Sequence, residues 1–108
     1  MPATAQCEFI FANRCQLSTV NLGGLQSLRE LSLTHNNISD LSFLSYAGCC
    51  LEKLYIDHNK LSGLDWLPGS LLVLTAGFNN VSGLEAVGLE LGRTKLSTLD
   101  LSFNPIRG

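Results

Sequence analysis

Residues 28–41 read LRELSLTHNNISDL, and this stretch decides the fold. If Leu28 is called place 1, apolar side chains stand at places 1, 4, 6, 11 and 14, and an asparagine stands at place 9. Places 4 and 6 alternate about a polar place 5, which predicts a short β-strand with one face turned inward. The apolar residues after place 9 recur at intervals of three, which suits a 3-10 turn better than a long α-helix.

The same pattern returns three times further along the chain. Leu51, Leu71 and Leu96 open these copies, and each copy has an asparagine at place 9. With a weaker copy upstream, the whole chain is one array of short repeats. The repeats span about residues 7–27, 28–50, 51–70, 71–95 and 96–108, the last of them truncated.

The weaker copy begins at Cys7 and places Ile10 and Ala12 inward. A competing register for this copy would turn Phe9 and Phe11 inward instead. Because side chains alternate along a strand, only one of the two pairs can face the core. The match to the other repeats favours Ile10 and Ala12.

This template is that of the leucine-rich repeat, and the chain resembles that family over nearly all of its length. The resemblance implies an α/β solenoid, with a short parallel sheet on the concave face and 3-10 or short helical turns on the convex face. Each repeat buries too little apolar surface alone, so neighbours must stack. The short, uneven repeats are similar to the intracellular branch of the family, which includes the leucine-rich regulatory subunit of protein phosphatase 1.

Asparagine at place 9 stands where the chain turns away from the strand. Backbone groups inside such a turn need partners, and an amide side chain can both donate to and accept from its own loop and the adjacent one. We therefore predict a buried structural ladder, which Cys15 continues in the first repeat as a small buried group. The ladder consists of Asn36, Asn59, Asn79 and Asn104.

Places 3, 5, 7 and 8 are expected to face the concave surface. They hold a mixture of aromatic, small polar and charged residues, and exposed aromatic rings beside polar groups are typical of protein-binding surfaces. The predicted contact residues are Glu30, His35, Lys53, Tyr55, Asp57, His58, Phe78, Asp100 and Phe103.

His35 and His58 share place 8 in neighbouring repeats, so their imidazoles are expected to lie close together, since adjacent strands are about 5 Å apart. A metal site would need a third ligand, and Asp57 should point away from His58. An aromatic column that continues through Phe78 and Phe103 is the better interpretation.

Glu30 and Lys53 share place 3 in neighbouring repeats. Opposite charges at directly facing positions of a sheet predict a cross-strand ion pair. Such a pair contributes from a few tenths to about 1 kcal/mol when it is exposed.

Charge and cysteine usage bear on partners and compartment. The formal net charge of −2 and the pI near 5.5 give no general attraction to nucleic acid or to an anionic membrane. No apolar run approaches the roughly 20 residues that cross a bilayer. The four cysteines lack the spacing of a disulfide framework or zinc site. The N-terminus lacks the basic and apolar segments of a secretory signal. We expect a cytoplasmic protein, with the nucleus or cilium as alternatives.

The function predicted from the sequence is a protein–protein interaction module, either a scaffold or a regulatory subunit. No nucleophile, acid–base pair or metal motif stands out, so neither catalysis nor a cofactor is expected. One alternative is a secreted or surface protein of bacteria or parasites, similar to the internalins. Another is the substrate-recognition part of a larger enzyme, such as a ubiquitin ligase. Neither end shows a polar cap, which indicates a fragment or self-association through the uncapped ends.

Overall fold

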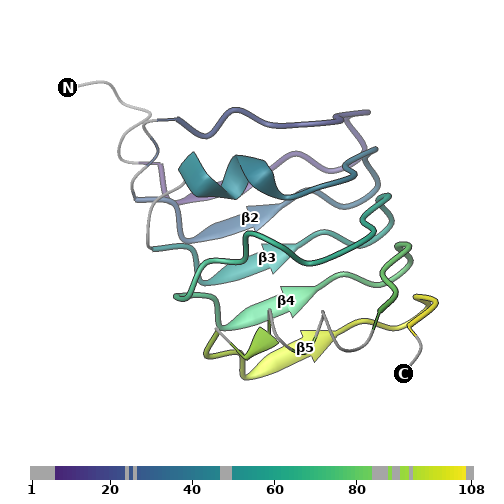
Figure 1. Ribbon diagram of the computed structural model, residues 1–108. Helices are drawn as coiled ribbons and strands as arrows, with labels where there is room; N and C mark the ends of the chain where they lie inside the picture. The colour runs from purple at the N-terminus through teal and green to yellow at the C-terminus, as the bar shows by residue number, and fades with distance from the viewer. Residues whose placement is uncertain are drawn as a thin grey trace.

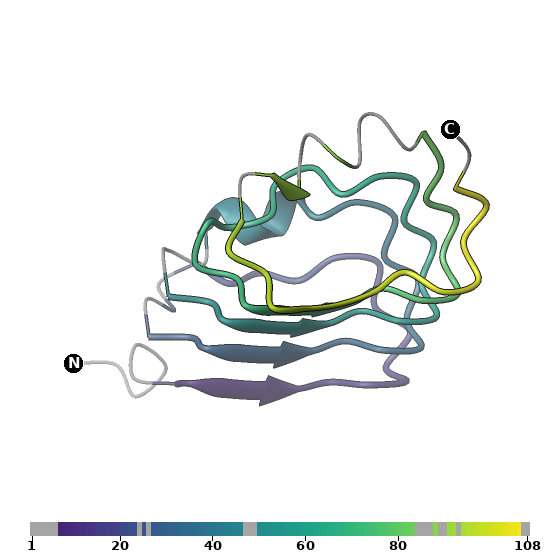
Figure 2. The ribbon, with the colours of Figure 1, turned by 90° about the horizontal axis from the view of Figure 1, so that it is seen from below.

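The computed structural model describes residues 7–23, 25, 27–46, 50–83, 88, 91–92 and 94–106. The strands form one parallel sheet in chain order, with one strand from each repeat. Figure 1 shows them stacked one above another, and Figure 2 shows the returning segments across the core from the sheet. The strands are β1 (Phe9–Phe11), β2 (Glu30–Ser32), β3 (Lys53–Tyr55), β4 (Val73–Thr75) and β5 (Thr98–Asp100). This is the predicted leucine-rich repeat solenoid.

The pairing of β1 with β2 fixes the register of the first repeat. Phe9 lies opposite Glu30 and Ile10 lies opposite Leu31, so Ile10 occupies the same place as the core leucines. Phe9 and Phe11 are 57% and 62% exposed. The register that turns both phenylalanines inward is therefore wrong, because it would invert every side chain of the strand.

The core consists of the repeated apolar places of the three middle repeats. These side chains are almost completely inaccessible, and burial of each aliphatic side chain contributes about 1.5–3 kcal/mol. In the fifth repeat Leu99 is 43% exposed, because no described residue packs on the outer side of β5. The fully buried set includes Leu28, Leu31, Leu33, Ile38, Leu51, Leu54, Ile56, Leu61, Leu71, Leu74, Ala76 and Val81.

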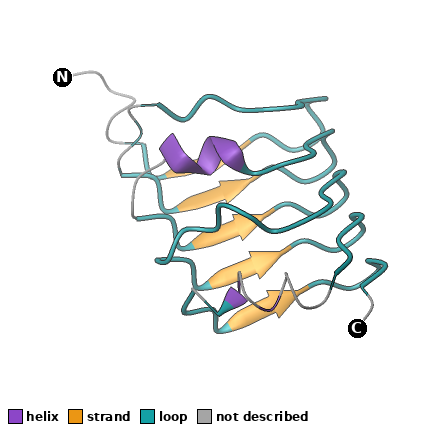
Figure 3. Cartoon of the chain, viewed as in Figure 1, coloured by secondary structure: helices purple, strands orange, loops and turns teal. Residues whose placement is uncertain are grey.

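The returning segments are short, as the spacing of their apolar residues predicts. In the second repeat the segment forms a 3-10 helix, η2 (Ser42–Tyr46), which Figure 3 shows as the longer purple ribbon and Figure 2 shows across the core from the strands. In the third repeat the Leu71 N–H donates to the Pro68 carbonyl at 3.2 Å and closes a tight return. The longest return runs from residue 84 to residue 95, a length that allows one or two helical turns, and it lies mostly outside the described residues.

The asparagine ladder is present, and Asn59 shows how it works. Its Nδ2 donates to the Ile56 and Asp57 carbonyls of its own loop at 3.0 and 3.1 Å. The same nitrogen donates to the Leu33 carbonyl of the preceding repeat at 2.9 Å. Its Oδ1 accepts from the Ile38 N–H of that repeat at 3.0 Å. One amide therefore satisfies backbone groups of two neighbouring repeats.

The other three asparagines repeat this arrangement. Asn36 and Asn79 are both 6% exposed. Asn104 is half-buried, but it makes the same contacts with the Ala76 carbonyl and the Val81 N–H of the preceding repeat. The predicted hydrogen bonding is confirmed for all four asparagines, and the predicted burial for Asn36, Asn59 and Asn79.

The prediction that Cys15 continues the ladder as a buried group is wrong. Cys15 is exposed, and its Sγ donates only to the Asn13 carbonyl at 3.3 Å. Its own N–H is instead bound by Asn36 Oδ1 at 3.0 Å. Within the described residues no repeat covers the outer side of the first one, so place 9 there has no preceding loop to bind.

The ladder predicts a sharp contrast between two adjacent asparagines. Asn79→Ala should lower the free energy of unfolding by about 2–4 kcal/mol, because it leaves buried backbone groups without partners. Asn80→Ala, at an exposed side chain, should change it by less than about 0.5 kcal/mol. Urea unfolding followed by circular dichroism measures both, and equal effects would contradict the structural role of place 9.

Candidate functional site

The concave face is the side of the sheet turned away from the core, and all nine predicted contact residues lie on it. Register pairing aligns place 3 and place 5 across the five strands, from Phe9 and Phe11 in β1 to Thr98 and Asp100 in β5. Phe9 and Phe11 are not among these nine residues. Their places 3 and 5 in the template assign them to the same face, and both are more exposed than Phe78, whose exposed fraction is 46%.

Four rings at place 8 form a continuous stack along one edge of this face. The ring centroids of His35 and His58 are 4.1 Å apart, those of His58 and Phe78 are 4.2 Å apart, and those of Phe78 and Phe103 are 4.3 Å apart. Adjacent planes differ by only 9–15°. The aromatic column predicted from the sequence is confirmed.

The backbone at place 8 explains why the rings align. His35, His58, Phe78 and Phe103 all have φ between 55° and 59°, a left-handed conformation that costs a residue with a side chain roughly 1–2 kcal/mol. The His35 N–H donates to the Asp57 carbonyl at 3.0 Å, and the other place 8 N–H groups with a following repeat do the same. Each repeat therefore turns in the same way and projects its ring at the same height.

The environment of His35 favours its neutral form. The pKa of His35 is lowered from its ordinary value of 6.5. Partial burial is the largest cause, and the positive charges of Arg14 and of a protonated His58 act in the same direction, whereas Asp57 opposes the shift. His35 is therefore uncharged at neutral pH, and the column then holds no like charges against each other at this position.

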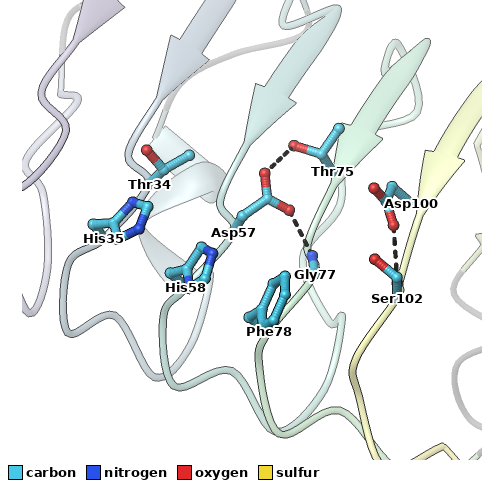
Figure 4. Close-up of a pocket in the computed structure, with 9 residues that line it drawn as sticks. All are labelled: Thr34, His35, Asp57, His58, Thr75, Gly77, Phe78, Asp100 and Ser102. Atoms are coloured by element: carbon cyan, nitrogen blue, oxygen red, sulfur yellow. Dashed lines mark hydrogen bonds between the residues drawn. The ribbon is translucent and has the colours of Figure 1, made fainter.

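Asp57 is held in place by the fourth repeat. Its Oδ2 accepts from the Thr75 hydroxyl at 2.8 Å, and its Oδ1 accepts from the Gly77 N–H at 2.6 Å. Figure 4 shows the carboxylate directed at these groups, away from the imidazole of His58, as predicted. Among the described residues no three histidine, cysteine or acidic side chains come together to hold a metal ion.

Asn13 makes the matching contacts between the first two repeats. Its Oδ1 accepts from both the Ser32 hydroxyl and the Thr34 N–H, each at 2.8 Å. Ser32 is only 6% exposed, so its hydroxyl is occupied within the chain and is not free for a partner. A hydrogen-bond acceptor at place 7 thus joins one repeat to the next.

A cavity of about 290 Å³ opens on the concave face over the second to fifth repeats. Its floor is Gly77, the only place 7 residue without a side chain. A Cβ there would lie 3.1–3.3 Å from Ser102 O, Ser102 Oγ and Asp57 Oδ1. Figure 4 shows the lining residues, which are Thr34, His35, Asp57, His58, Thr75, Gly77, Phe78, Asp100 and Ser102.

The ion pair predicted between Glu30 and Lys53 is not formed, although the two residues are register partners. Among the described residues, the ion pair within 4.0 Å is between Arg29 Nη1 and Glu8 Oε1, at 3.9 Å. It lies one residue earlier in the repeat. Lys53, Arg29 and Glu8 are exposed and Glu30 is half-buried, and solvent screening leaves little energy to hold either pair in one geometry.

No helix of the described chain is both long enough and apolar enough to span a bilayer.

Comparison with known proteins gives three informative relatives. Osteomodulin of Rattus norvegicus is 33% identical over 81 residues, which cover 71% of this chain and 19% of that protein. Tubulin-folding cofactor E of Arabidopsis thaliana is 38% identical over 96 residues, covering 74% and 18% respectively. The platelet glycoprotein Ib alpha chain of Mus musculus is 36% identical over 64 residues, covering 58% and 8%. The chain thus spans a fifth or less of the length of each relative.

Two family models match the chain directly. A model of leucine-rich repeats in two copies matches residues 26–69, and a model of a single leucine-rich repeat matches residues 93–108. Together they cover more than half of the chain and include β2, β3 and β5. The chain belongs to the leucine-rich repeat family.

Proposed function

We propose that this chain binds another protein through its concave face, as a scaffold or a regulatory module. The observation that carries the proposal is the exposure of Phe9, Phe11, Phe78 and Phe103 on that one face, at 57%, 62%, 46% and 73%. Aromatic side chains gathered on one face are a common feature of interfaces, where they supply most of the binding energy.

The rigidity of the face supports the same proposal. Stacking fixes the place 8 rings, and hydrogen bonds from neighbouring repeats fix the side chains of Asn13 and Asp57. A surface that is already ordered loses less conformational entropy when a partner docks. Preorganised contacts of this kind favour recognition of a protein surface.

The family supports a binding role without choosing a partner. Leucine-rich repeat proteins are typically binding modules and not enzymes. The names of the relatives point to different settings, tubulin folding for one and a platelet glycoprotein for another. We propose the intracellular branch and a cytoplasmic location, on the basis of the cysteine spacing and the short, uneven repeats.

A second arrangement uses the same face. The chain covers a fifth or less of each relative, so it can serve as the recognition part of a larger protein whose activity lies in other segments. The concave face would then select the substrate, and the contact residues would be the same.

Phe11→Ala combined with Phe103→Ala is expected to abolish partner capture without unfolding the chain. Both rings are mostly exposed, so they contribute little to the core, whereas loss of two interface aromatics should weaken binding more than about tenfold. Quantitative pull-down of the proteins captured by the unmodified chain measures the effect.

Trp66→Ala is the matched control, because Trp66 is 55% exposed but lies in the return of the third repeat, outside the concave face. It should leave capture unchanged, and thermal melts should show all three chains folded. Loss of capture in the Trp66 variant alone would place the interface elsewhere and contradict the proposal.

Acidification should destabilise the folded chain through His35. Because its pKa is lowered in the folded chain, the unfolded chain binds more protons below about pH 6.5, and stability falls as the pH drops. Phenylalanine occupies place 8 in the fourth and fifth repeats and does not titrate. When the pH is lowered from about 7.5 to about 5.5, the Tm of the His35→Phe variant should therefore fall less than the Tm of the unmodified chain.

Asp40 and Asp100, whose pKa values are lowered from 3.8, affect stability mainly below this interval and equally in both chains. An identical fall in Tm for the two chains would show that the protonation of His35 does not oppose folding.

A further inference from the structure

We infer that the cavity over Gly77 is a subsite for an arginine side chain of the protein partner. This inference rests on the proposed function and names the chemical group that the concave face recognises. Three features of the cavity carry it: its shape, its surplus of negative charge and the orientation of its aromatic wall.

The floor of the cavity is a glycine. Place 7 holds Asn13, Thr34, Asp57 and Ser102 in the other repeats, whereas Gly77 projects no side chain from the sheet. The space directly above Gly77 is narrow, because a Cβ there would stand 3.1 Å from the Ser102 carbonyl oxygen and 3.3 Å from Asp57 Oδ1. The cavity, of about 290 Å³, is at the small end of ligand sites. It suits a single side chain better than a folded element.

The charge comes from carboxylates on two sides of Gly77. Asp57 comes from the third repeat, and its carboxylate accepts a hydrogen bond from Thr75 at the end of β4. Asp100 is the last residue of β5 and the register partner of Thr75. Thr75 therefore lies between the two aspartates. No lysine or arginine lines the cavity. The two carboxylates offer eight lone-pair sites. Hydrogen bonds within the chain occupy only part of them: Thr75 and Gly77 donate to Asp57, and Ser102 donates to Asp100, its N–H at 2.9 Å.

The negative charge of Asp57 is not required by the fold. Asn13 occupies the same place two repeats earlier, and its single Oδ1 accepts from both the hydroxyl and the N–H of the next repeat. A neutral amide is therefore sufficient to join the repeats. The charge at Asp57 is surplus to the structure and available to a cation. The Ser102 hydrogen bonds lower the pKa of Asp100, which keeps that carboxylate charged as well.

The aromatic wall selects the kind of cation. Phe78 is stacked between His58 and Phe103, at 4.2 and 4.3 Å, so both faces of its ring are covered. A quaternary ammonium is held by ring faces, and both faces of His58 and of Phe78 are covered, which leaves only their edges free. Recognition must therefore use the carboxylates and their hydrogen bonds. The planar fork of a guanidinium, with five donors, can bind two carboxylates at once, whereas an ammonium acts as a single point of charge.

The test uses three small probes that differ only in the end of the side chain: N-acetyl-arginine amide, N-acetyl-lysine amide and N-acetyl-citrulline amide. Citrulline has nearly the shape of arginine without its charge. Each is titrated into the isotope-labelled chain while the backbone amide NMR signals of Gly77, Phe78 and Ser102 are followed. We expect arginine to bind with Kd on the order of millimolar, lysine more weakly, and citrulline without saturation.

Two variants localise the binding. Asp57→Asn keeps the hydrogen bonds that Asn13 shows to be compatible with an amide, so the chain should fold normally. It should raise the Kd for the arginine probe at least about fivefold. Asp100→Asn should act in the same direction. Asp65→Asn, which removes the same charge from the exposed turn between β3 and β4, should leave the Kd unchanged.

Several outcomes would overturn the subsite: equal Kd for arginine and citrulline, shifts that miss Gly77 and its neighbours, or the same Kd in Asp57→Asn and Asp65→Asn. The proposed function is tested separately by the capture experiment. If a partner depends on Phe11 and Phe103 while the arginine probe fails to bind, the subsite is wrong and the function stands. If arginine binds but no partner depends on the concave face, the subsite stands as a small-ligand site and protein binding is wrong.

Discussion

The buried amide of the place 9 asparagine is the interaction on which this structure depends. In Asn59 and Asn79 a single side chain binds carbonyls of its own loop and both a carbonyl and an N–H of the preceding repeat. Without it, each turn would enclose unpaired backbone groups at a cost of about 1–3 kcal/mol apiece. Because each amide serves two loops, it also sets the spacing and rotation of one repeat against the next.

That fixed spacing is what produces the candidate site. The turn held by each asparagine places the preceding residue in the left-handed region, and its side chain stands on the edge of the concave face. Repetition then stacks His35, His58, Phe78 and Phe103 along that edge. The scaffold and the recognition surface are thus built from different places of the same repeat. Place 7 serves both, because Asn13 and Asp57 accept hydrogen bonds from the next repeat on the concave face.

The errors of sequence reasoning arose where a residue's surroundings depart from those of an average repeat. Cys15 is exposed because no described repeat lies outside the first one, so its place in the template does not imply burial. Glu30 and Lys53 are register partners without an ion pair, because screening by solvent leaves exposed charges weakly constrained. The ring column was predictable because it depends only on equal places in successive repeats.

The sequence by itself determined the repeat, the strand register, the buried leucines and the asparagine ladder. Each of these follows from a local period, and a period is visible in one dimension. Only the tertiary structure decided that Asp57 is held by Thr75 and Gly77, and that Gly77 and two carboxylates line one cavity on the concave face. These contacts join residues about 20 positions apart through distances of a few ångströms, which depend on how closely and at what angle the repeats stack.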